Sequence, residues 1–353
     1  MRPTVHDIAE MAGVSLATVD RVLNRRPGVR EATIGKVEEA IARLGYVRDM
    51  AAANLAKRRT YPLVFVLPEG PNSFMRSLEA GVRQAMRRSA VERTDIRLVT
   101  VPPFDAAALA AALNALDPKE IAGVALVATE SASVRAAVHR LRQAGVSVVT
   151  LVSDLPNSRR DHYVGIDNVA AGRTAASLVG RFVGRSGGKV AVLAGSMLVR
   201  DHVERRMGFE QVMRAEYPKL DILPPIEGRD DAGIVAELMN RCLAEHPEIV
   251  GIYSLGAGNR GLIEALEARR LGGKVIVVAH ELTDHARKAL HDGTFDAVIN
   301  QDAGHEVRSA IRVLKARIDG LALVEGQERI RIDVFLRDNL PDVADETPIF
   351  EEV

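Results

Sequence analysis

The feature that most constrains the fold is a regular alternation of apolar and amphipathic segments that begins at Tyr61. Short apolar runs, long enough for buried strands, are each followed by a stretch with helical periodicity. Such an alternation favours a parallel sheet whose crossover connections are right-handed. The first series of expected strands covers residues 63–67, 96–101, 123–128 and 146–152, and the expected helices between them cover 74–88, 106–116 and 134–144.

A second series of the same kind follows a predicted helix at 170–183. The two series together predict an α/β body of two lobes, each a doubly wound parallel sheet, with a cleft between them. The expected strands of the second series cover 189–194, 250–255, 274–280 and 296–300. The expected lobes consist of residues 61–168 plus 303–330, and of residues 169–302 plus 331–353.

Length and composition limit the class of protein. A chain of 353 residues suits a short module joined to a two-lobed body. Cys242 is the only cysteine, so the sequence excludes an intrachain disulfide and a cysteine-based zinc cluster. The first residues lack the apolar region of a secretory signal, and no apolar run reaches membrane-spanning length. We therefore expect a soluble, cytoplasmic protein without a membrane anchor or a bound metal.

Charge is distributed unevenly along the chain, although the formal net charge is zero. Residues 1–60 contain eleven Lys and Arg against seven Asp and Glu, a surplus of four positive charges that the rest of the chain balances. A basic amino-terminal segment on an acidic body suits local contact with phosphates. Any contact with nucleic acid is therefore expected to be confined to that segment.

The amino-terminal segment is predicted to form three short helices. Thr4 is a suitable N-cap with Asp7 three residues later, and Gly13 can adopt the left-handed conformation that ends the first helix. Ser15 is expected to cap the second helix, and a third amphipathic helix is expected over 31–44. Three short helices around a small core predict a helix-turn-helix domain, with a plain three-helix bundle as the alternative.

The second of these helices directs small and polar side chains away from the core. Arg21 can donate two hydrogen bonds to O6 and N7 of guanine, which is worth about 1 to 3 kcal/mol of discrimination. Leu16 and Ala17 can offer only apolar contact, for instance to a thymine methyl group. The side chains expected to face the core are Val14, Val19, Val22 and Leu23. The pattern indicates a helix that reads base edges in DNA.

Residues 49–60 are predicted to form a hinge between this head and the body. The segment is a good helix former with a basic end, yet it is far too short to be a stable helix alone. We expect it to become ordered only when two copies pair on DNA, and a simple linker is the alternative interpretation.

The segments TVHDIAEMAGVSLATVDRVLN, VREAT and KVEEAIARLGY closely resemble the DNA-binding head of the lac/galactose/ribose repressor family. The resemblance continues through the hinge into the body, which is similar to ribose-type periplasmic sugar-binding proteins. It implies a helix-turn-helix domain at 1–48, a hinge helix at 49–60 and an effector-binding and dimerisation domain at 61–353. It further implies a homodimeric transcriptional regulator, expected to be a repressor, that binds a palindromic operator and responds to a small molecule.

The resemblance also implies roles for single residues of the head. Leu16, Ala17 and Arg21 match the family's base-reading positions. Leu55 matches the residue that enters the minor groove at a base step and kinks it. The residues that match positions holding phosphates or the adjoining groove are Ser15, Thr18, Asn24, Gly28 and Thr33.

The head departs from the family's pattern at two places. Asp20 stands where the family usually has Ser. An acid near phosphate lowers affinity, so Asp20 must point away or face a basic neighbour such as Arg25. Arg48 and Asp49 replace the usual Pro-Asn pair at the start of the hinge.

Candidate effector-binding residues follow from the rule that ligands of doubly wound sheets bind beyond the carboxyl ends of the strands. Carboxylates and amides can bond pairs of hydroxyl groups, an arginine can donate in a fixed fork, and an aromatic ring can cover a sugar face. The rule selects Asn72, Phe74, Asp167, Arg205, Asn259, Glu281 and Gln301. These residue types predict a sugar or polyol as the ligand.

The resemblance to ribose-type binding proteins supports most of this selection. The chain departs from the sugar-binding pattern after the fourth strand, where Val152 and Ser153 replace a common Asp-Arg pair. That departure argues against ribose itself. The residues that match ligand-contacting positions are Phe74, Asp167, Arg205, Glu281 and Gln301.

Two other functions fit parts of the sequence. GAGNRG at 256–261 is a G-x-G-x-x-G motif between a strand and a helix, and Glu281 lies 20 residues beyond its last glycine, as in a nicotinamide-dinucleotide-binding oxidoreductase. The motif begins deep in the chain, however, and a DNA-binding head does not suit a dehydrogenase. No nucleophile motif and no metal-ligand spacing accompanies it, so we expect no enzyme activity and no cofactor. A sugar-binding protein without a regulatory role would have no use for the head.

Overall fold

The computed structural model describes residues 3–24, 26–46, 60–184 and 186–341. The chain separates into two units, Met1–Thr60 and Tyr61–Val353, each of which is described by itself. The predicted wedge residue Leu55 and nearly all of the predicted hinge lie outside the described residues. Among the described helices, none combines the length and the apolar character that a membrane span requires.

The head contains the three expected helices, α1 (Val5–Ala12), α2 (Leu16–Leu23) and α3 (Glu31–Leu44). The predicted capping box is confirmed: the Thr4 amide donates to the Asp7 carboxylate at 2.7 Å, and the Asp7 amide donates to the Thr4 hydroxyl at 3.4 Å. The small core between the helices consists of Ile8, Ala9, Val19, Val37 and Ala40.

The first lobe of the body is built on a five-stranded parallel sheet with the strand order β2-β1-β3-β4-β5. Long apolar runs give this sheet its buried strands, as predicted. The strands are β1 (Tyr61–Pro68), β2 (Thr94–Val101), β3 (Gly123–Leu126), β4 (Ser147–Leu151) and β5 (His162–Val164).

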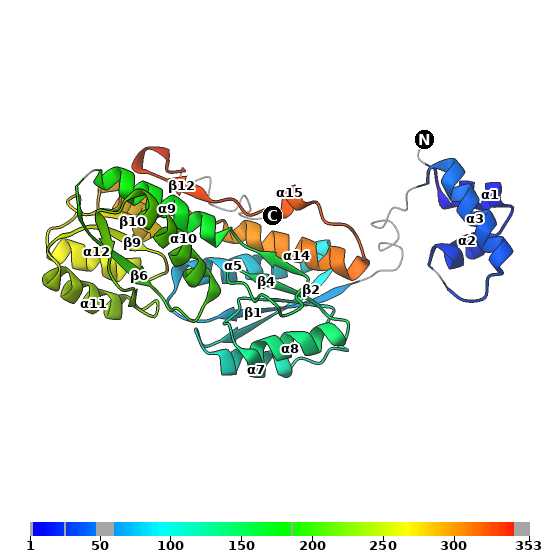
Figure 1. Cartoon of the computed structure of the whole chain (residues 1–353). Helices are drawn as coiled ribbons and strands as arrows, with labels where there is room; N and C mark the ends of the chain where they lie inside the picture. Colours follow the sequence, from blue (N-terminus) through cyan, green and yellow to red (C-terminus); the bar gives the residue numbers. More distant parts are fainter. Residues whose placement is uncertain (1–2, 25, 47–59, 185, 342–353) are drawn as a thin grey trace. The chain divides into compact units, whose positions relative to one another are not determined.

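Helices cover both faces of this sheet. On one face lie α7 (Ala106–Asn114) and α8 (Ala132–Gln143), and on the other lie α5 (Ser73–Arg87) and the late helix α14 (Ala303–Asp319) (Figure 1). The short helix α6 (Ser89–Glu92) precedes β2. The helix α14 returns from the second lobe, so the first lobe is completed by a segment far along the chain.

The second lobe is built on a sheet with the order β12-β11-β10-β9-β6-β7, and β8 also pairs with β6. All pairs are parallel except that β12 runs antiparallel to β11. The strands are β6 (Gly188–Ala194), β7 (Leu220–Ile222), β8 (Ile226–Glu227), β9 (Ile249–Ser254), β10 (Ile276–His280), β11 (Ala297–Asn300) and β12 (Asp333–Phe335).

Helices also cover both faces of the second sheet. On one face lie α9 (Asn168–Val183) and α10 (Arg200–Glu216), and their apolar side chains share a core with β6, β9, β10 and β11. The helices of the other face are α11 (Ala232–Glu245), α12 (Asn259–Ala268) and α13 (Asp284–His291). Two short turns flank β12, namely α15 (Glu325–Glu328) and the 3₁₀ turn η1 (Arg337–Asn339).

The second sheet differs from the prediction in two ways. The antiparallel pairing of β12 means that the sheet is not wholly parallel. The strands β7, β8 and β12 and the helix α11 between β8 and β9 are additional to the predicted elements. With three and two residues, β7 and β8 are too short to produce a recognisable alternation of apolar and polar residues.

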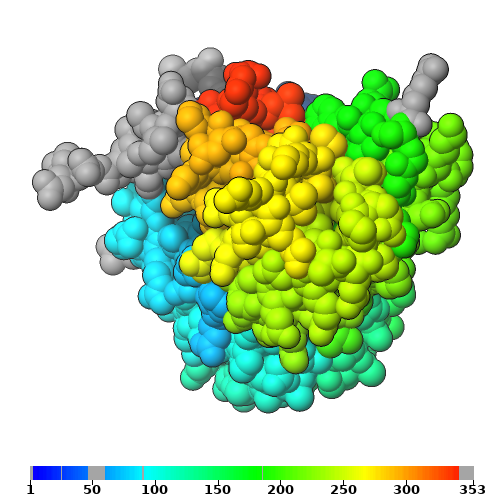
Figure 2. Space-filling model, turned by 90° about the vertical axis from the view of Figure 1, so that its left-hand side faces the viewer, coloured from blue at the N-terminus to red at the C-terminus, as the bar shows by residue number. Residues whose placement is uncertain are grey.

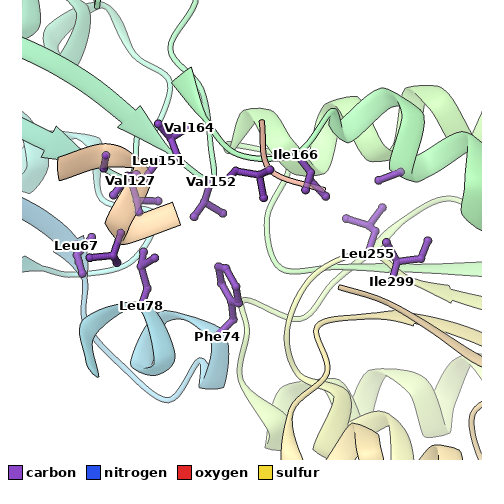
Figure 3. Packing of buried hydrophobic residues seen from close by; sticks show 14 of the residues in the cluster. Leu67, Phe74, Leu78, Val127, Leu151, Val152, Val164, Ile166, Leu255 and Ile299 are labelled. Carbon is purple, nitrogen blue, oxygen red and sulfur yellow. The ribbon is translucent and has the colours of Figure 1, made fainter. Parts of the chain in front are cut away.

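The chain crosses between the two sheets three times. The crossings lie at 165–167 between β5 and α9, at 301–302 between β11 and α14, and at 329–332 between α15 and β12. The largest hydrophobic core continues through both lobes. Figure 3 shows Phe74 and Val152 between the buried side chains of the two lobes. The lobes are therefore joined by both covalent connections and packing.

Helices α9 and α10 cross in close contact through two glycines. A Cβ atom added to Gly172 would lie 1.9 Å from the carbonyl oxygen of Arg205, and one added to Gly208 would lie 2.1 Å from the carbonyl oxygen of Val169. Both distances are far below the contact distance of a real Cβ atom, so the two backbones touch where only hydrogen fits. This crossing fixes the position of the helix that carries Arg205.

Gly172→Ala is expected to destabilise the body strongly, because the new methyl group would meet backbone atoms rather than a movable side chain. Overpacking of this kind costs roughly 1 to 3 kcal/mol or more, which chemical denaturation would detect as a lower midpoint. Gly326→Ala, at an exposed position with nothing within 4 Å of the added Cβ, is the matched control. Equal midpoints for G172A and the unaltered protein would contradict the close crossing.

Candidate functional site

A cavity lies between the lobes at the carboxyl ends of the strands of both sheets. It encloses about 840 Å³, part of which is open to solvent. The first lobe lines it with the segments that follow β1, β2, β3 and β4, and the second lobe with those that follow β6, β8, β9, β10 and β11. Doubly wound sheets bind ligands at this edge. The position of the cavity, lined from both lobes, therefore indicates a ligand site.

Unusual backbone conformations are concentrated around this cavity. Among the described residues, nine that are not glycine have a positive φ, and five of the nine line the cavity. Val152, with φ 59°, is the least expected, because a β-branched side chain disfavours this conformation. Residues held in strained conformations cluster at functional sites. The five residues are Phe104, Val152, Arg229, Asp230 and Glu281.

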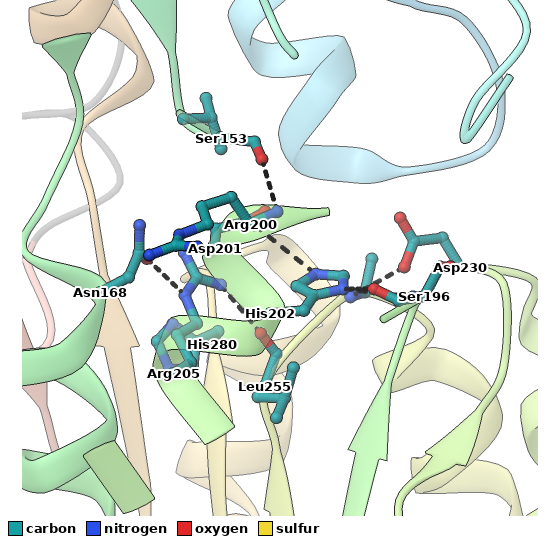
Figure 4. A network of polar contacts seen from close by, with 12 residues as sticks. Ser153, Asn168, Ser196, Arg200, Asp201, His202, Arg205, Asp230, Leu255 and His280 are labelled. Carbon is teal, nitrogen blue, oxygen red and sulfur yellow. Dashed lines mark hydrogen bonds and ion pairs between the residues drawn. The ribbon is translucent and has the colours of Figure 1, made fainter. Parts of the chain in front are cut away.

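Arg205 is the central polar side chain of the cavity and is only 2% exposed. Its Nε donates to Asn168 Oδ1 at 2.8 Å, and its Nη1 donates to the Leu255 carbonyl oxygen at 2.9 Å (Figure 4). Its Nη2 lies 3.7 Å from Glu281 Oε1. The guanidinium is thus held by protein groups on two sides and presents its remaining nitrogen near a carboxylate.

Four side chains that line the cavity carry a buried polar atom without a hydrogen-bond partner. Three of these atoms are acceptors, namely Asp201 Oδ1, Glu281 Oε2 and Gln301 Oε1, and one is a donor, Arg205 Nη2. The Gln301 amide donates its other end to Glu281 Oε1 at 2.8 Å. Buried polar groups are nearly always hydrogen-bonded in folded proteins. Four such atoms around one cavity indicate that it binds a polar ligand.

Carboxyl groups outnumber the positive charge at this end of the cavity. Burial raises the pKa of Glu281 to about 7, although the charge of Arg205 opposes the rise. A further carboxyl group, Glu306 of α14, is fully buried, and both of its oxygens lack a partner. Burial and the nearby charge of Glu281 raise the pKa of Glu306 well above its usual value. Near neutral pH the Glu281 carboxyl group is therefore partly protonated.

Asn72 connects the two lobes across the cavity. Its Oδ1 accepts from the amides of Phe74 at 3.0 Å and Met75 at 3.1 Å, which fixes it to the start of α5. Its Nδ2 donates to Asp230 Oδ2 at 2.7 Å, and the other Asp230 oxygen accepts from the Ala257 amide at 3.2 Å. In the space-filling view, the blue surface of the first lobe meets the yellow and yellow-green surface of the second (Figure 2).

The cavity brings together five of the seven predicted effector-binding residues, namely Asn72, Phe74, Arg205, Glu281 and Gln301. Asp167 does not line it. The Asp167 carboxylate is exposed and accepts from the Ala170 amide at 2.9 Å, so that it caps α9. The next residue, Asn168, is the one that bonds Arg205. The strand-end rule selects this segment correctly but cannot separate a helix cap from an inward-facing neighbour.

Asn259 is buried, and its side chain is hydrogen-bonded within the second lobe. Its side chain accepts from the Ser254 hydroxyl at 2.7 Å and donates to the His280 carbonyl oxygen at 2.9 Å. It lines a smaller adjoining cavity of about 370 Å³, which shares Asn72 and Phe74 with the large one. The two bonds tie the start of α12 to the ends of β9 and β10.

Three acidic residues that line the cavity, Glu69, Asp201 and Asp230, are additional to the sequence prediction, and Glu69 among them is exposed. Asp201 lies four residues before Arg205 on α10, so the two share one face of the helix. That spacing is a signal by which it could have been found. Asp230 follows β8, whose two residues leave no trace in the apolar pattern. The strand-end rule therefore cannot find Asp230.

The glycines of the GAGNRG motif are explained by close packing within the second lobe. A Cβ atom on Gly256 would lie 2.7 Å from the Gly195 amide nitrogen, and one on Gly261 would lie 2.0 Å from the Ala232 carbonyl oxygen. The second glycine, Gly258, is the one that a dinucleotide-binding loop keeps for the approach to phosphates, and a Cβ atom there would lie 2.6 Å from Val235 Cγ2. We interpret the motif as a packing feature.

The predicted base readers lie on the exposed face of α2. Leu16 is 42% exposed, and Ala17 and Arg21 are exposed as well. The hydroxyl of Ser15 caps the helix by accepting from the Thr18 amide at 3.2 Å. The head therefore presents these side chains from a helix whose start is fixed.

Asp20 is paired within the head. It accepts from the side-chain amide of Asn24 at 2.6 Å and forms an ion pair with Arg26 at 3.3 Å. Its basic neighbour is thus Arg26, whereas Arg25, which the sequence suggests, lies outside the described residues. The Asn24 amide also donates to the Asp20 carbonyl oxygen at 2.7 Å, so the Asn24 side chain is held against the end of α2.

The remaining predicted DNA contacts lie around the start of α3. Gly28 is exposed and adopts φ 97°, a conformation that favours glycine. Thr33 lies half-buried in the first turn, and the N-cap residue Arg30 makes no side-chain cap. Amide groups at such an uncapped helix start suit contact with phosphate.

Comparison with known proteins assigns both units. Residues 4–49 match the family model for bacterial regulatory proteins of the lacI family, and residues 63–322 match the periplasmic binding protein domain. The chain therefore belongs to the periplasmic binding protein family through its body, and its head is a domain of the lacI family of bacterial regulatory proteins.

Curated relatives include transcriptional regulators along most of the chain. The regulator CelR of Thermobifida fusca is 26% identical over 337 residues, which cover 90% of this chain and 93% of that protein. The regulator GntR of Escherichia coli K12 is 25% identical over 275 residues, 78% of this chain and 79% of that protein. Catabolite control protein A of Priestia megaterium is 40% identical over 82 residues, 23% of this chain and 25% of that protein. The matches agree with the prediction that the chain is not an enzyme.

Solved structures resemble the body. GanP, a glucose-galactose binding protein of Geobacillus stearothermophilus, superposes with a TM-score of 0.71 at 21% identity, covering 80% of this chain and 99% of that one. A solute-binding protein of Burkholderia graminis in complex with D-arabinose superposes with a TM-score of 0.72 at 25% identity, covering 79% and 96%. These likenesses confirm the predicted α/β fold of the body.

Glu281→Gln is expected to change how stability depends on pH. The pKa of Glu281 is about 7 in the folded protein and 4.5 ordinarily. Between pH 4.5 and 7 the carboxyl group therefore ionises more readily in the unfolded chain, so the free energy of unfolding falls as pH rises through this window. Glutamine does not ionise, so the variant should lose less unfolding free energy across the window, by on the order of 2 kcal/mol. Urea denaturation at both ends of the window measures this difference. Glu267→Gln, at an exposed position on α12, is the control, and parallel profiles for E281Q and the unaltered protein would refute the expectation.

Proposed function

We propose that the chain is a transcriptional repressor whose affinity for its operator changes when a sugar or polyol binds in the cavity between the lobes. The observation that carries this proposal is the set of unpartnered polar atoms on Asp201, Arg205, Glu281 and Gln301. Hydroxyl groups both donate and accept, so one polyhydroxylated ligand satisfies carboxylate, amide and guanidinium groups together. The sugars held by similar solved proteins support a ligand of this class.

The DNA-binding side of the proposal is a homodimer on a palindromic operator in the cytoplasm. Two copies of α2 enter successive major grooves about 34 to 36 Å apart. Arg21 reads guanine, Leu16 and Ala17 contact apolar base edges, and the hinge orders with Leu55 in the minor groove. The residues assigned to phosphates or the adjoining groove are Ser15, Thr18, Asn24, Gly28 and Thr33. The exposure of α2 and the basic surplus of the head support this arrangement.

Closure of the lobes links the two sites. A ligand that contacts both lobes favours the closed form, which the Asn72–Asp230 hydrogen bond of 2.7 Å also stabilises. Closure turns one lobe against the other at the dimer interface and so changes the spacing of the two hinges. If the closed form holds the hinges apart, the ligand is an inducer; if it brings them together, the ligand is a corepressor. In both cases DNA affinity changes only by the ligand's differential affinity for the two forms.

Arg21→Ala is expected to remove the sequence preference of the protein while leaving general, salt-dependent DNA binding. The bidentate contact to guanine is worth about 1 to 3 kcal/mol, so discrimination should fall by roughly tenfold or more. Selection from random duplexes, followed by titration of the selected duplex and a scrambled one, measures this ratio. Arg43→Ala, which removes an exposed arginine paired with Glu39 on α3, is the matched control. An unchanged preference in R21A would exclude Arg21 as the base reader.

Arg205→Lys is expected to impair the response to effector without impairing operator binding. Lysine keeps the charge but loses the planar fork that bonds Asn168 and Leu255 and points a third nitrogen toward the ligand. The effector concentration for half response should rise by roughly tenfold or more. Titration of sugars and polyols against a labelled operator complex measures it.

The matched control for this experiment is Arg206→Lys, because Arg206 pairs with Glu210 on α10 and does not line the cavity. It should respond to effector as the unaltered protein does. An equally normal response in R205K would show that the ligand does not use the guanidinium, and would count against the proposed site.

A further inference from the structure

The two walls of the cavity differ in chemistry. Among the described residues, every buried side-chain atom that lacks a hydrogen-bond partner and belongs to a cavity-lining residue comes from the second lobe. The four residues are Asp201, Arg205, Glu281 and Gln301. The polar binding capacity of the cavity is therefore one-sided.

The wall of the first lobe is apolar along the ends of four strands. Phe74, Val127 and Val152 are at most 8% exposed, and Figure 3 shows the Phe74 ring beside Val152 at the junction of the lobes. The loop after β2 adds two prolines and an aromatic ring. The apolar residues of this wall include Phe74, Pro102, Pro103, Phe104, Val127 and Val152.

Most polar side chains of this wall are already engaged within the protein. Asn72 bonds the start of α5 and Asp230. Ser153 Oγ accepts from the Arg200 amide at 3.0 Å (Figure 4). Glu69 is exposed and accepts from the Thr100 hydroxyl at 3.3 Å. What this wall still offers a polar ligand is the Thr129 hydroxyl, the hydrogen of the Ser153 hydroxyl and the exposed Glu69 carboxylate, and the surface around Phe74, Phe104 and the two prolines is apolar.

A free pyranose suits only one side of such a cavity. It carries hydroxyl groups around its whole edge, and those that face the second lobe meet carboxylate, amide and guanidinium groups. Hydroxyl groups that face the apolar part of the first-lobe wall, around Phe74, Phe104 and the prolines, would leave water without gaining a partner, which disfavours binding. A ligand whose second end is itself apolar avoids this loss and gains from burial against the rings.

We propose that the effector is a glycoside with a ring-sized apolar aglycone, such as an aryl glycoside. The sugar hydroxyls bond the second-lobe groups around Arg205, and the aglycone packs between Phe74, Phe104 and the two prolines. This inference rests on the proposed function, since it names the class of sugar derivative that the same cavity takes.

The test uses the full-length protein and matched ligand series. For glucose, galactose, mannose and xylose, in both anomers, the free sugar, the methyl glycoside and the phenyl glycoside are compared by thermal shift and calorimetry. In each series that binds, the phenyl glycoside should bind roughly tenfold or more tightly than the methyl glycoside, because the additional ring is buried against apolar surface.

Variants of the apolar wall locate the aglycone. Phe104 is half-exposed in a loop, so Phe104→Ser should leave the fold intact, which the melting temperature without ligand checks. Phe104→Ser should reduce the ratio of the affinities for the phenyl and the methyl glycoside to about threefold or less. Phe104→Leu should keep most of this affinity ratio, because leucine retains apolar bulk. Val91→Ser, at an apolar residue that is 82% exposed and outside the cavity, is the control and should keep the whole ratio.

Two failures are distinguishable. If a free sugar or methyl glycoside binds and the phenyl glycoside does not bind more tightly, the aglycone is excluded while the sugar response stands. A phenyl preference that survives F104S unchanged would likewise overturn the placement against this wall. If no member of any series binds, the inference is overturned; if, in addition, a carbohydrate-free metabolite fraction changes operator affinity, the proposed function is overturned as well.

Discussion

The buried positive charge of Arg205 is the constraint on which the cavity depends. Removing a charge from water is costly unless its hydrogen bonds are made within the protein. Asn168 and the Leu255 carbonyl make two of them at 2.8 and 2.9 Å. The helix that carries Arg205 is in turn held against α9 by the contacts at Gly172 and Gly208. The polar end of the cavity is therefore positioned by helix packing in the second lobe and does not depend on loop conformation alone.

Around this fixed charge, the protein maintains several features that are unfavourable in isolation. Five strained residues and four unpartnered polar atoms line one cavity. Such features persist only where the surrounding structure enforces them, and here the continuous core that joins both lobes supplies that support. Their coincidence distinguishes this cavity from an accidental gap between two packed lobes. Burial at this cavity is also what raises the pKa of Glu281 to about 7.

The sequence predicts those parts of the fold that have long apolar runs. The helix over 31–44 has the expected bounds, and the strands around the cavity begin or end within a few residues of prediction. The pattern does not reveal β7, β8 and β12, each of which has at most three residues, and the antiparallel direction of β12 is decided by long-range pairing. For the site, strand ends lead to Glu281, to Gln301 and to the segment after β6, in which the expected residue is Arg205. Asp201, four residues earlier on the same helix, is not among the expected residues, and Asp167 is selected because a cap and an inward-facing residue look alike in sequence.

The ion pair between Asp20 and Arg26 affects the electrostatics of the head as a whole. Each phosphate that a cationic side chain neutralises releases close to one condensed counterion. The logarithm of the binding constant therefore falls by about 0.9 per such phosphate for each tenfold increase in salt concentration. An arginine that already has an internal carboxylate partner displaces fewer such ions. The ionic-strength dependence of binding should therefore be shallower than the number of basic residues in the head would suggest, and a larger share of the affinity comes from contacts that added salt does not weaken.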